Sequence, residues 1–223
     1  MYPVFAIAIA AAYFIGSIPF GLIIAKAYGM DLRSIGSGNI GATNVSRALG
    51  RKWGYICFLL DFLKGFIPMI SMLPFTSPMS IQTTGEKNIV FLLWLSVGCA
   101  AILGHVFPVY VKFKGGKGVA TSFGIAMGLW PYYTISALIA GLLWIATVLI
   151  WRYVSLSSII AAISFPIAFI TMMIIRPYWE ISTLWPLLIP AFAIPAMVIL
   201  RHRENIHRLR IGTENKILQK KAR

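Results

Sequence analysis

A short stretch from Gly104 to Thr121 (GHVFPVYVKFKGGKGVAT) brings lysines and glycines together between two apolar runs. Its lysines and its clustered glycines are Lys112, Lys114, Lys117, Gly115, Gly116 and Gly118. Lysine supplies positive charge, and glycine allows backbone N–H groups to approach a ligand closely. The apolar sequence that follows can begin a helix whose positive end points back into the stretch. We therefore expect an anion-binding site, although lysines next to a membrane also attract lipid headgroups without specificity.

A second polar segment, RSIGSGNIGATNVSRALG at 33–50, is rich in hydroxyl, amide and guanidinium groups. These groups belong to Ser34, Ser37, Asn39, Thr43, Asn44 and Arg47. Hydroxyls beside an arginine fork are suited to a phosphate or an oxyanion, whereas serines and asparagines can also satisfy the backbone of their own loop. For Ser37 and Arg47 we favour anion binding, because the density of polar groups exceeds what turns require.

A third polar segment, RHRENIHRLRIGTE at 201–214, places His202 and Asn205 three residues apart. On a continuing helix the two side chains point the same way. A histidine among arginines is biased toward its neutral form, which suits a base or a hydrogen-bonding group. Capping of the last helical turn explains the same spacing equally well.

Two nucleotide-binding motifs are excluded. Gly36, Gly38 and Gly41 satisfy G-x-G-x-x-G, but no strand precedes them and no βαβ unit fits this sequence. The lysine-glycine stretch is not a Walker A loop, because Lys117 is followed by glycine. The basic residues fall between apolar runs, which is typical of a membrane face and argues against nucleic-acid binding.

Composition predicts an all-α membrane protein. The chain has 223 residues, of which 59% are hydrophobic and 12% charged, and its mean hydropathy is +0.82. One soluble core cannot bury so much apolar surface, so lipid must surround most of the chain. We expect a single integral-membrane domain over residues 1–223. No basic segment precedes the first apolar run, which we interpret as a retained span.

Apolar runs predict about seven transmembrane helices. The spans are expected at 4–25, 53–74, 89–111, a short one from 119, one ending at 151, and at 156–175 and 181–200. The uncharged run 119–150 would form a helix of about 48 Å, too long for a hydrocarbon core of about 30 Å. Trp130, Pro131, Tyr132 and Tyr133 combine a helix break with interfacial aromatic residues, so a turn is expected there. This layout puts the N-terminus outside and the C-terminus in the cytoplasm with most of the basic residues.

Asp61 and Lys64 lie inside the second expected span. They are three residues apart and share one face of a helix, so an ion pair turned into the bundle is expected in preference to direct ligand contact.

The three polar segments resemble the motifs of a known family. SGNIGATNVSR at 37–47, GHVFPVYVKFKGGKGVAT at 104–121 and RHRENIHRLRIGTE at 201–214 are similar to those of the acyl-phosphate glycerol-3-phosphate acyltransferases. GSIPFGLIIAK at 16–26 and LDFLKG at 60–65 also resemble this family. These are bacterial membrane enzymes that begin phospholipid synthesis, and the resemblance covers nearly the whole chain.

The resemblance implies transfer of an acyl group from acyl phosphate to the 1-hydroxyl of sn-glycerol 3-phosphate, giving lysophosphatidic acid and phosphate. It implies that Ser37, Arg47, His202 and Asn205 are catalytic, that Gly115, Gly116, Lys117 and Gly118 bind glycerol phosphate, that Ser155 contacts phosphate, and that Glu214 is structural. Ser157 and Ser158 are alternatives to Ser155. We add Asn39, Asn44 and Lys112 as candidate substrate-binding residues.

The expected setting is the bacterial cytoplasmic (inner) membrane, with several spans and the active site at the cytoplasmic face. Membrane lipids and the two substrates are the expected partners, and an upstream enzyme that forms acyl phosphate is a further candidate. No cofactor, metal or nucleic acid is expected.

The expected chemistry needs no acyl-enzyme, because acyl phosphate is already activated. The protein has to align two anions and stabilise the charge on the carbonyl oxygen and the departing phosphate. Soluble acyltransferases carry a histidine and an aspartate five residues apart; here Tyr110 follows His105 at that spacing and His207 follows His202. The base is therefore expected to be a substrate phosphate oxygen, in preference to His202.

Two other classes remain as alternatives. A transporter of an organic phosphate would use the same groups for binding alone, but should carry ionisable groups near the midplane and an inverted repeat. A membrane phosphatase would need a nucleophilic histidine or a metal-ligand cluster, which six scattered acidic residues do not supply.

Overall fold

The structure is a computed structural model that describes residues 1–76 and 83–217, and all regular secondary structure within these residues is helical. The helices are α1 (Tyr2–Ser17), α2 (Phe20–Ala27), α3 (Ala42–Leu49), α4 (Arg51–Ile70), α5 (Leu73–Thr76), α6 (Thr84–Val106), the 3-10 helix η1 (Val109–Val111), α7 (Val119–Gly128), α8 (Thr134–Trp151), α9 (Val154–Ile175), α10 (Ile181–Arg201) and α11 (Arg203–Arg210). The expected all-α membrane fold is confirmed.

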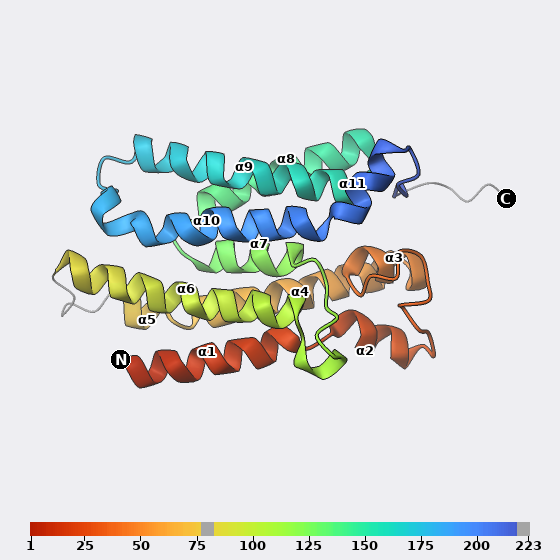
Figure 1. Ribbon diagram of the computed structural model, residues 1–223, viewed down its shortest axis with the longest axis horizontal. Coiled ribbons are helices and arrows are strands. Elements are labelled where there is room, and N and C mark those ends of the chain that lie inside the picture. Colours follow the sequence, from red (N-terminus) through yellow and green to blue (C-terminus); the bar gives the residue numbers. More distant parts are fainter. Residues whose placement is uncertain (77–82, 218–223) are drawn as a thin grey trace.

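Six segments of the described chain are long and apolar enough to cross a membrane. They correspond to six of the seven expected spans and are formed by α1 with α2, α4 with α5, α6 with η1, α8, α9 and α10. The short fourth span is represented by α7, which has 10 residues and therefore a length of about 15 Å, half of the hydrocarbon core. Figure 1 shows the N-terminus and α11 at opposite ends of the bundle.

The expected break within 119–150 is present. Helix α7 ends at Gly128 and α8 begins at Thr134, so the aromatic and proline residues between them form a turn, as predicted. A second break divides the first apolar run, because α1 ends at Ser17 and α2 begins at Phe20, immediately after Pro19. Proline lacks the N–H that a continuous helix needs, so the first span is built from two shorter helices.

Glycines allow two pairs of helices to pack backbone against backbone. A Cβ on Gly104 of α6 would overlap the carbonyl oxygen of Tyr13 on α1. A Cβ on Gly65 of α4 would overlap the carbonyl oxygen of Thr121 on α7. Small residues at helix interfaces are a common route to tight packing in membranes, where apolar burial gives little driving force between helices. The start of α7 is consequently held directly against α4.

The polar segments gather on the side of the bundle away from the N-terminus. In Figure 1, α2, α3, α11 and the loop that precedes α7 all lie toward the right of the view, while the N-terminus lies at the left. Segments that are distant in the sequence thus share one end of the molecule, as expected of a single site.

Candidate active site

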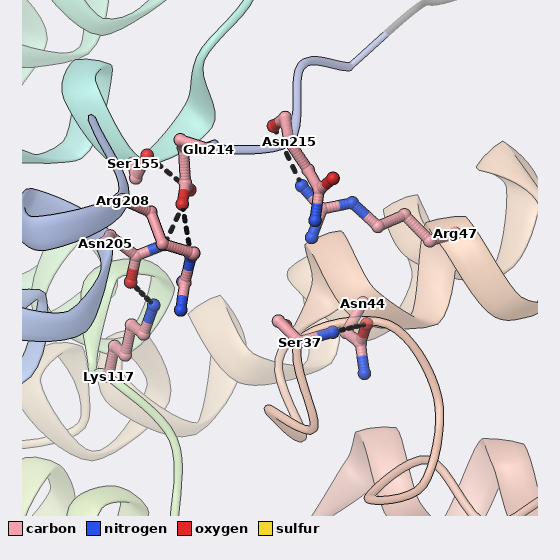
Figure 2. A network of polar contacts seen from close by, with 9 residues as sticks. All are labelled: Ser37, Asn44, Arg47, Lys117, Ser155, Asn205, Arg208, Glu214 and Asn215. Atoms are coloured by element: carbon pink, nitrogen blue, oxygen red, sulfur yellow. Dashed lines mark hydrogen bonds and ion pairs between the residues drawn. The ribbon is translucent and has the colours of Figure 1, made fainter. Parts of the chain in front are cut away.

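A network of hydrogen bonds joins Lys117, Asn205 and Glu214 (Figure 2). The Lys117 Nζ donates to Asn205 Oδ1, and Asn205 Nδ2 donates to Glu214 Oε1 over 2.6 Å. The same carboxylate accepts from Ser155 Oγ at 2.7 Å and from Arg208 Nε at 2.7 Å. Glu214 therefore ties the start of α7, the start of α9 and α11 together.

Ser155 is the serine of its segment that belongs to this network. The hydroxyls of Ser157 and Ser158 donate instead to the carbonyl oxygens of Tyr153 and Val154, one helical turn back. Both are thus directed into their own helix, and the sequence alone left this choice open.

Arg208 is a site residue that the sequence reasoning did not single out. It lies three residues after Asn205 on α11, so it shares the helix face on which His202 and Asn205 were expected. The spacing of three was therefore the signal that identifies it. Its Nε is bound to Glu214, and its side chain is 30% exposed.

The opposite side of the site is formed by the loop before α3. Asn44 is 1% exposed, and its amide donates to the carbonyl oxygens of Leu32 and Ile35 and accepts from the N–H of Ser37. Asn39 accepts from the N–H of Gly41. These amides hold the loop itself, which favours a structural role for both over the substrate contact expected for them. The residue they present is Ser37, which is exposed.

Arg47 projects from α3 toward the C-terminal segment (Figure 2). Its Nη2 donates to the carbonyl oxygen of Asn215 over 3.2 Å. Figure 2 shows Ser37 and Arg47 on one side and Lys117, Asn205 and Arg208 on the other. Two halves that come from different parts of the chain therefore face one site.

Gly115 and Gly116 act differently from the expectation that glycine opens the backbone to a ligand. Their N–H groups donate to the carbonyl oxygens of Val106 and His105, over 3.2 and 3.1 Å. A Cβ on Gly116 would overlap the imidazole of His105. Both glycines are required because the loop presses against the end of α6, and their N–H groups are already bound.

Lys117 and Gly118 form the part of this loop that leads into α7. Gly118 has a φ of 84°, a left-handed conformation that favours glycine, and it caps the start of α7. The first N–H groups of a helix have no intrahelical partner and attract anions. Lys112 and Lys114 are exposed, whereas Lys117 is partly buried and drawn into the network.

Electrostatics set the protonation of Lys117 and His202. Burial lowers the pKa of Lys117 to about 8, an effect that Arg208 and Arg47 reinforce and Glu214 opposes. Burial, followed by the charge of Lys117, lowers the pKa of His202 to about 4, so its imidazole is neutral at pH 7.

His202 is 3% exposed, and its Nδ1 lies 2.7 Å from the carbonyl oxygen of Val198. A carbonyl can only accept, so Nδ1 carries the proton and Nε2 keeps a free lone pair. The neutral form agrees with the bias expected for a histidine among arginines.

The fold and the site together define a helical membrane protein with a polar centre rich in cationic side chains at one end of its bundle. Residues 6–212 match a family model described as glycerol-3-phosphate acyltransferase. The glycerol-3-phosphate acyltransferase of Aquifex aeolicus (strain VF5) is 44% identical over 205 residues, which cover 92% of this chain and 95% of that protein. That of Geobacter sulfurreducens is 45% identical over 210 residues, covering 93% and 94%. The chain therefore belongs to the glycerol-3-phosphate acyltransferase family, and it is an acyltransferase.

Solved structures support this assignment. The crystal structure of PlsY (YgiH), an integral membrane glycerol 3-phosphate acyltransferase, in its glycerol 3-phosphate form matches with a TM-score of 0.79 and 42% identity over 96% of each chain. The lysophosphatidic acid form matches with a TM-score of 0.76 and 41% identity, over 96% of this chain and 95% of that one. The helical integral-membrane architecture is thus shared across the chain.

Replacing Glu214 with glutamine should lower the free energy of unfolding by about 2–3 kcal/mol, because three donors lose a charged acceptor. Burial alone would raise the pKa of Glu214, but the hydrogen bonds from Asn205, Arg208 and Ser155 outweigh it and hold the pKa below 4.5. The stabilisation is therefore present above pH 4.5 and lost as the pH falls through the lowered pKa.

Thermal unfolding in detergent as a function of pH measures this effect. Glu204→Gln is the matched control, because Glu204 is an exposed glutamate on α11, the helix that carries Asn205 and Arg208. Equal unfolding temperatures for the two variants at pH 7 would contradict the structural role of Glu214.

Proposed function

We propose that this protein transfers an acyl group from acyl phosphate to the 1-hydroxyl of sn-glycerol 3-phosphate, forming lysophosphatidic acid and phosphate. The observation that carries the proposal is the pair of polar half-sites, with Arg47 and Ser37 facing Lys117, Asn205 and Arg208. An excess of cationic donors at one site suits two phosphorylated substrates. The names of the related proteins support glycerol 3-phosphate as the acceptor.

Lys117 and the start of α7 are proposed to bind the phosphate of glycerol 3-phosphate. The lysine ammonium and the free N–H groups of the helix start provide charge and directed donors. Asn205 positions the ammonium group of Lys117. Gly116 and Gly118 have no side chain, so the loop can pack closely against α6. Lys112 contributes charge at the boundary only, because it is exposed.

The acyl chain is proposed to lie in an apolar cavity of about 360 Å³ between α7, α8, α9 and α10. Val119 and Val198 line it, and these residues adjoin the site, since Val119 follows Lys117 by two positions and Val198 holds His202. Farther along, the lining includes Ala140 and Trp144. A chain in this cavity would place its carbonyl group beside the polar half-sites.

In the proposed reaction the acceptor hydroxyl oxygen attacks the carbonyl carbon of acyl phosphate. A new ester C–O bond forms, and the bond between the carbonyl carbon and the phosphate oxygen breaks. Arg47 and Ser37 are proposed to stabilise the charge that develops on the carbonyl oxygen and the departing phosphate. The low pKa of His202, about 4, makes it a weak base, whereas a phosphate monoester has a second pKa of about 6. The proton of the hydroxyl therefore goes to a substrate phosphate oxygen.

Purified protein supplied with acyl phosphate or acyl-CoA and labelled glycerol 3-phosphate should yield lysophosphatidic acid from acyl phosphate. Lys117→Ala should raise the KM for glycerol 3-phosphate at least about tenfold, whereas Arg47→Ala should lower kcat by about 100-fold or more. Because Lys117 loses its proton above its pKa of about 8, the wild-type KM should rise above that pH. Lys114→Ala, an exposed lysine of the same loop, is the control. No product with either donor would rule out the proposed reaction.

Ala140→Leu narrows the apolar cavity and should shift the preferred donor toward shorter acyl chains. The ratio of kcat/KM for a long acyl phosphate to that for a short one should fall by about tenfold, because methylene groups of the long acyl chain can no longer be buried in the cavity. Ala146→Leu on the same helix is the control, since Ala146 is exposed and lies outside the cavity lining. An unchanged chain-length profile for Ala140→Leu would place the chain elsewhere.

We further propose that the protein is a single domain in the bacterial inner membrane, with its N-terminus outside and its site at the cytoplasmic face among membrane lipids. The donor would come from an enzyme that forms acyl phosphate. A cysteine introduced at the exposed Lys216 should react with an impermeant reagent only from the cytoplasmic side. Labelling from the outside would reverse the proposed orientation.

A further inference from the structure

Three ionisable side chains that the proposed reaction does not use lie buried beneath the site. Asp61 and Lys64 on α4 are 4% and 3% exposed, and His105 on α6 is 6% exposed. The ion pair expected from the sequence is present, with Asp61 Oδ1 and Lys64 Nζ 2.8 Å apart. Ionisable groups among membrane-spanning helices are costly and therefore usually serve a purpose.

Lys64 connects this cluster to the half of the site that carries Ser37. Its Nζ donates to the carbonyl oxygen of Ile18, over 3.1 Å, at the break between α1 and α2. At the start of α2, Gly21 packs so closely on Ile40 that a Cβ would overlap the Ile40 carbonyl oxygen. Ile40 belongs to the loop of Ser37. The ammonium group of Lys64 thus holds the backbone between α1 and α2, and the Ser37 loop packs against the start of α2.

Asp61 and His105 connect the cluster to the half of the site that carries Lys117. The hydroxyl of Thr121, in the first turn of α7, donates to the carbonyl oxygen of Asp61 over 3.0 Å. The imidazole of His105 lies against Gly116, and the His105 carbonyl oxygen accepts the Gly116 N–H. The residues on both sides of Lys117 therefore rest on residues of the cluster: Thr121 on the backbone of Asp61, and Gly116 on the backbone and the imidazole of His105.

The contacts within the cluster exclude a direct catalytic role for His105. Its Nδ1 lies 3.7 Å from Asp61 Oδ1, so a carboxylate from another helix faces the imidazole. The other edge of the ring is covered by Gly116, and His105 is 6% exposed. The space between Ser17, Lys64 and His105 is too small for a water molecule. The cluster acts on the site only through the segments that it holds.

We propose that Asp61, Lys64 and His105 form a positioning cluster that fixes the Lys117 loop relative to the Ser37 loop. The kinetic consequence of this inference rests on the proposed function, but its structural consequence does not. A pair that merely neutralises itself would be replaceable by two apolar residues without effect on either loop. A positioning cluster would not, because its bonds to Ile18 and its contact with His105 would be lost.

The decisive variant is therefore the double replacement Asp61→Leu with Lys64→Met, which leaves no unpaired charge in the bundle. A second variant, His105→Phe, keeps a ring over Gly116 and removes the nitrogen that faces Asp61. Trp94→Phe is the matched control, because it removes another buried hydrogen bond between α6 and α4, from Trp94 Nε1 to the Met69 carbonyl oxygen over 2.8 Å.

Hydrogen exchange of the amides at 113–116 reports the position of the Lys117 loop without any substrate. Exchange should become at least about tenfold faster in the double variant and in His105→Phe, and stay unchanged in Trp94→Phe. The KM for glycerol 3-phosphate should also rise at least about tenfold in the double variant, since small misplacements of binding groups are costly.

Wild-type exchange and wild-type KM in the folded double variant would overturn the positioning role. If the double variant does not fold, exchange in His105→Phe decides, and an unchanged rate there overturns the inference. Absence of lysophosphatidic acid from the wild-type protein would overturn the proposed function alone, because the exchange measurement still tests the cluster.

Discussion

The hydrocarbon chains of a bilayer cannot hydrogen-bond to backbone N–H and C=O groups, and this constraint determines the architecture of the molecule. Every long apolar run of the described chain is helical, and irregular backbone occurs at the ends of helices or under cover of other residues. The break at Ile18 is an example. The helix does not continue there, so the carbonyl oxygen of Ile18 lacks its usual helical donor and accepts a hydrogen bond from the ammonium group of Lys64 instead. The polar loops are consequently confined to the ends of the bundle, where they can meet one another.

Close helix packing converts this general constraint into a specific geometry. Glycines bring α1 onto α6 and α4 onto α7 with backbone touching backbone. The half-length helix α7 is held along α4, so its positive end stays in one place beside Lys117. A rigid helix start is a better anion site than a free loop, because its donors need no ordering when the ligand binds.

The balance of charge explains why a carboxylate stands among so many cations. Lys117, Arg208 and Arg47 would repel one another in the absence of substrate, and Glu214 offsets that repulsion while it accepts three hydrogen bonds. The network leaves one cation, Lys117, with a pKa close to the physiological range. A bound phosphate would stabilise its charged form, so binding and protonation are coupled at this residue.

The helical membrane class, nearly all the spans, the break near Pro131 and the three polar segments could be predicted from the amino-acid sequence. These follow from hydropathy, proline and charge, which act locally. The sequence also predicted the ion pair of Asp61 and Lys64, because the two residues are neighbours on one helix. The motifs of these segments also indicated the glycerol-3-phosphate acyltransferase family, whose model matches residues 6–212.

Which polar groups meet at the site depends on how the helices pack. The structure selects Ser155 over its neighbours, brings Arg208 into the network, and directs the amides of Asn39 and Asn44 toward the loop before α3. It also showed that Gly115 and Gly116 make room for α6 and do not open their N–H groups to a ligand. The contact of Ser155 with Glu214 joins residues that are far apart in the sequence. The others lie closer in the sequence, but in every case packing sets the direction of the side chain or N–H toward its partner, and a local sequence pattern does not show that direction.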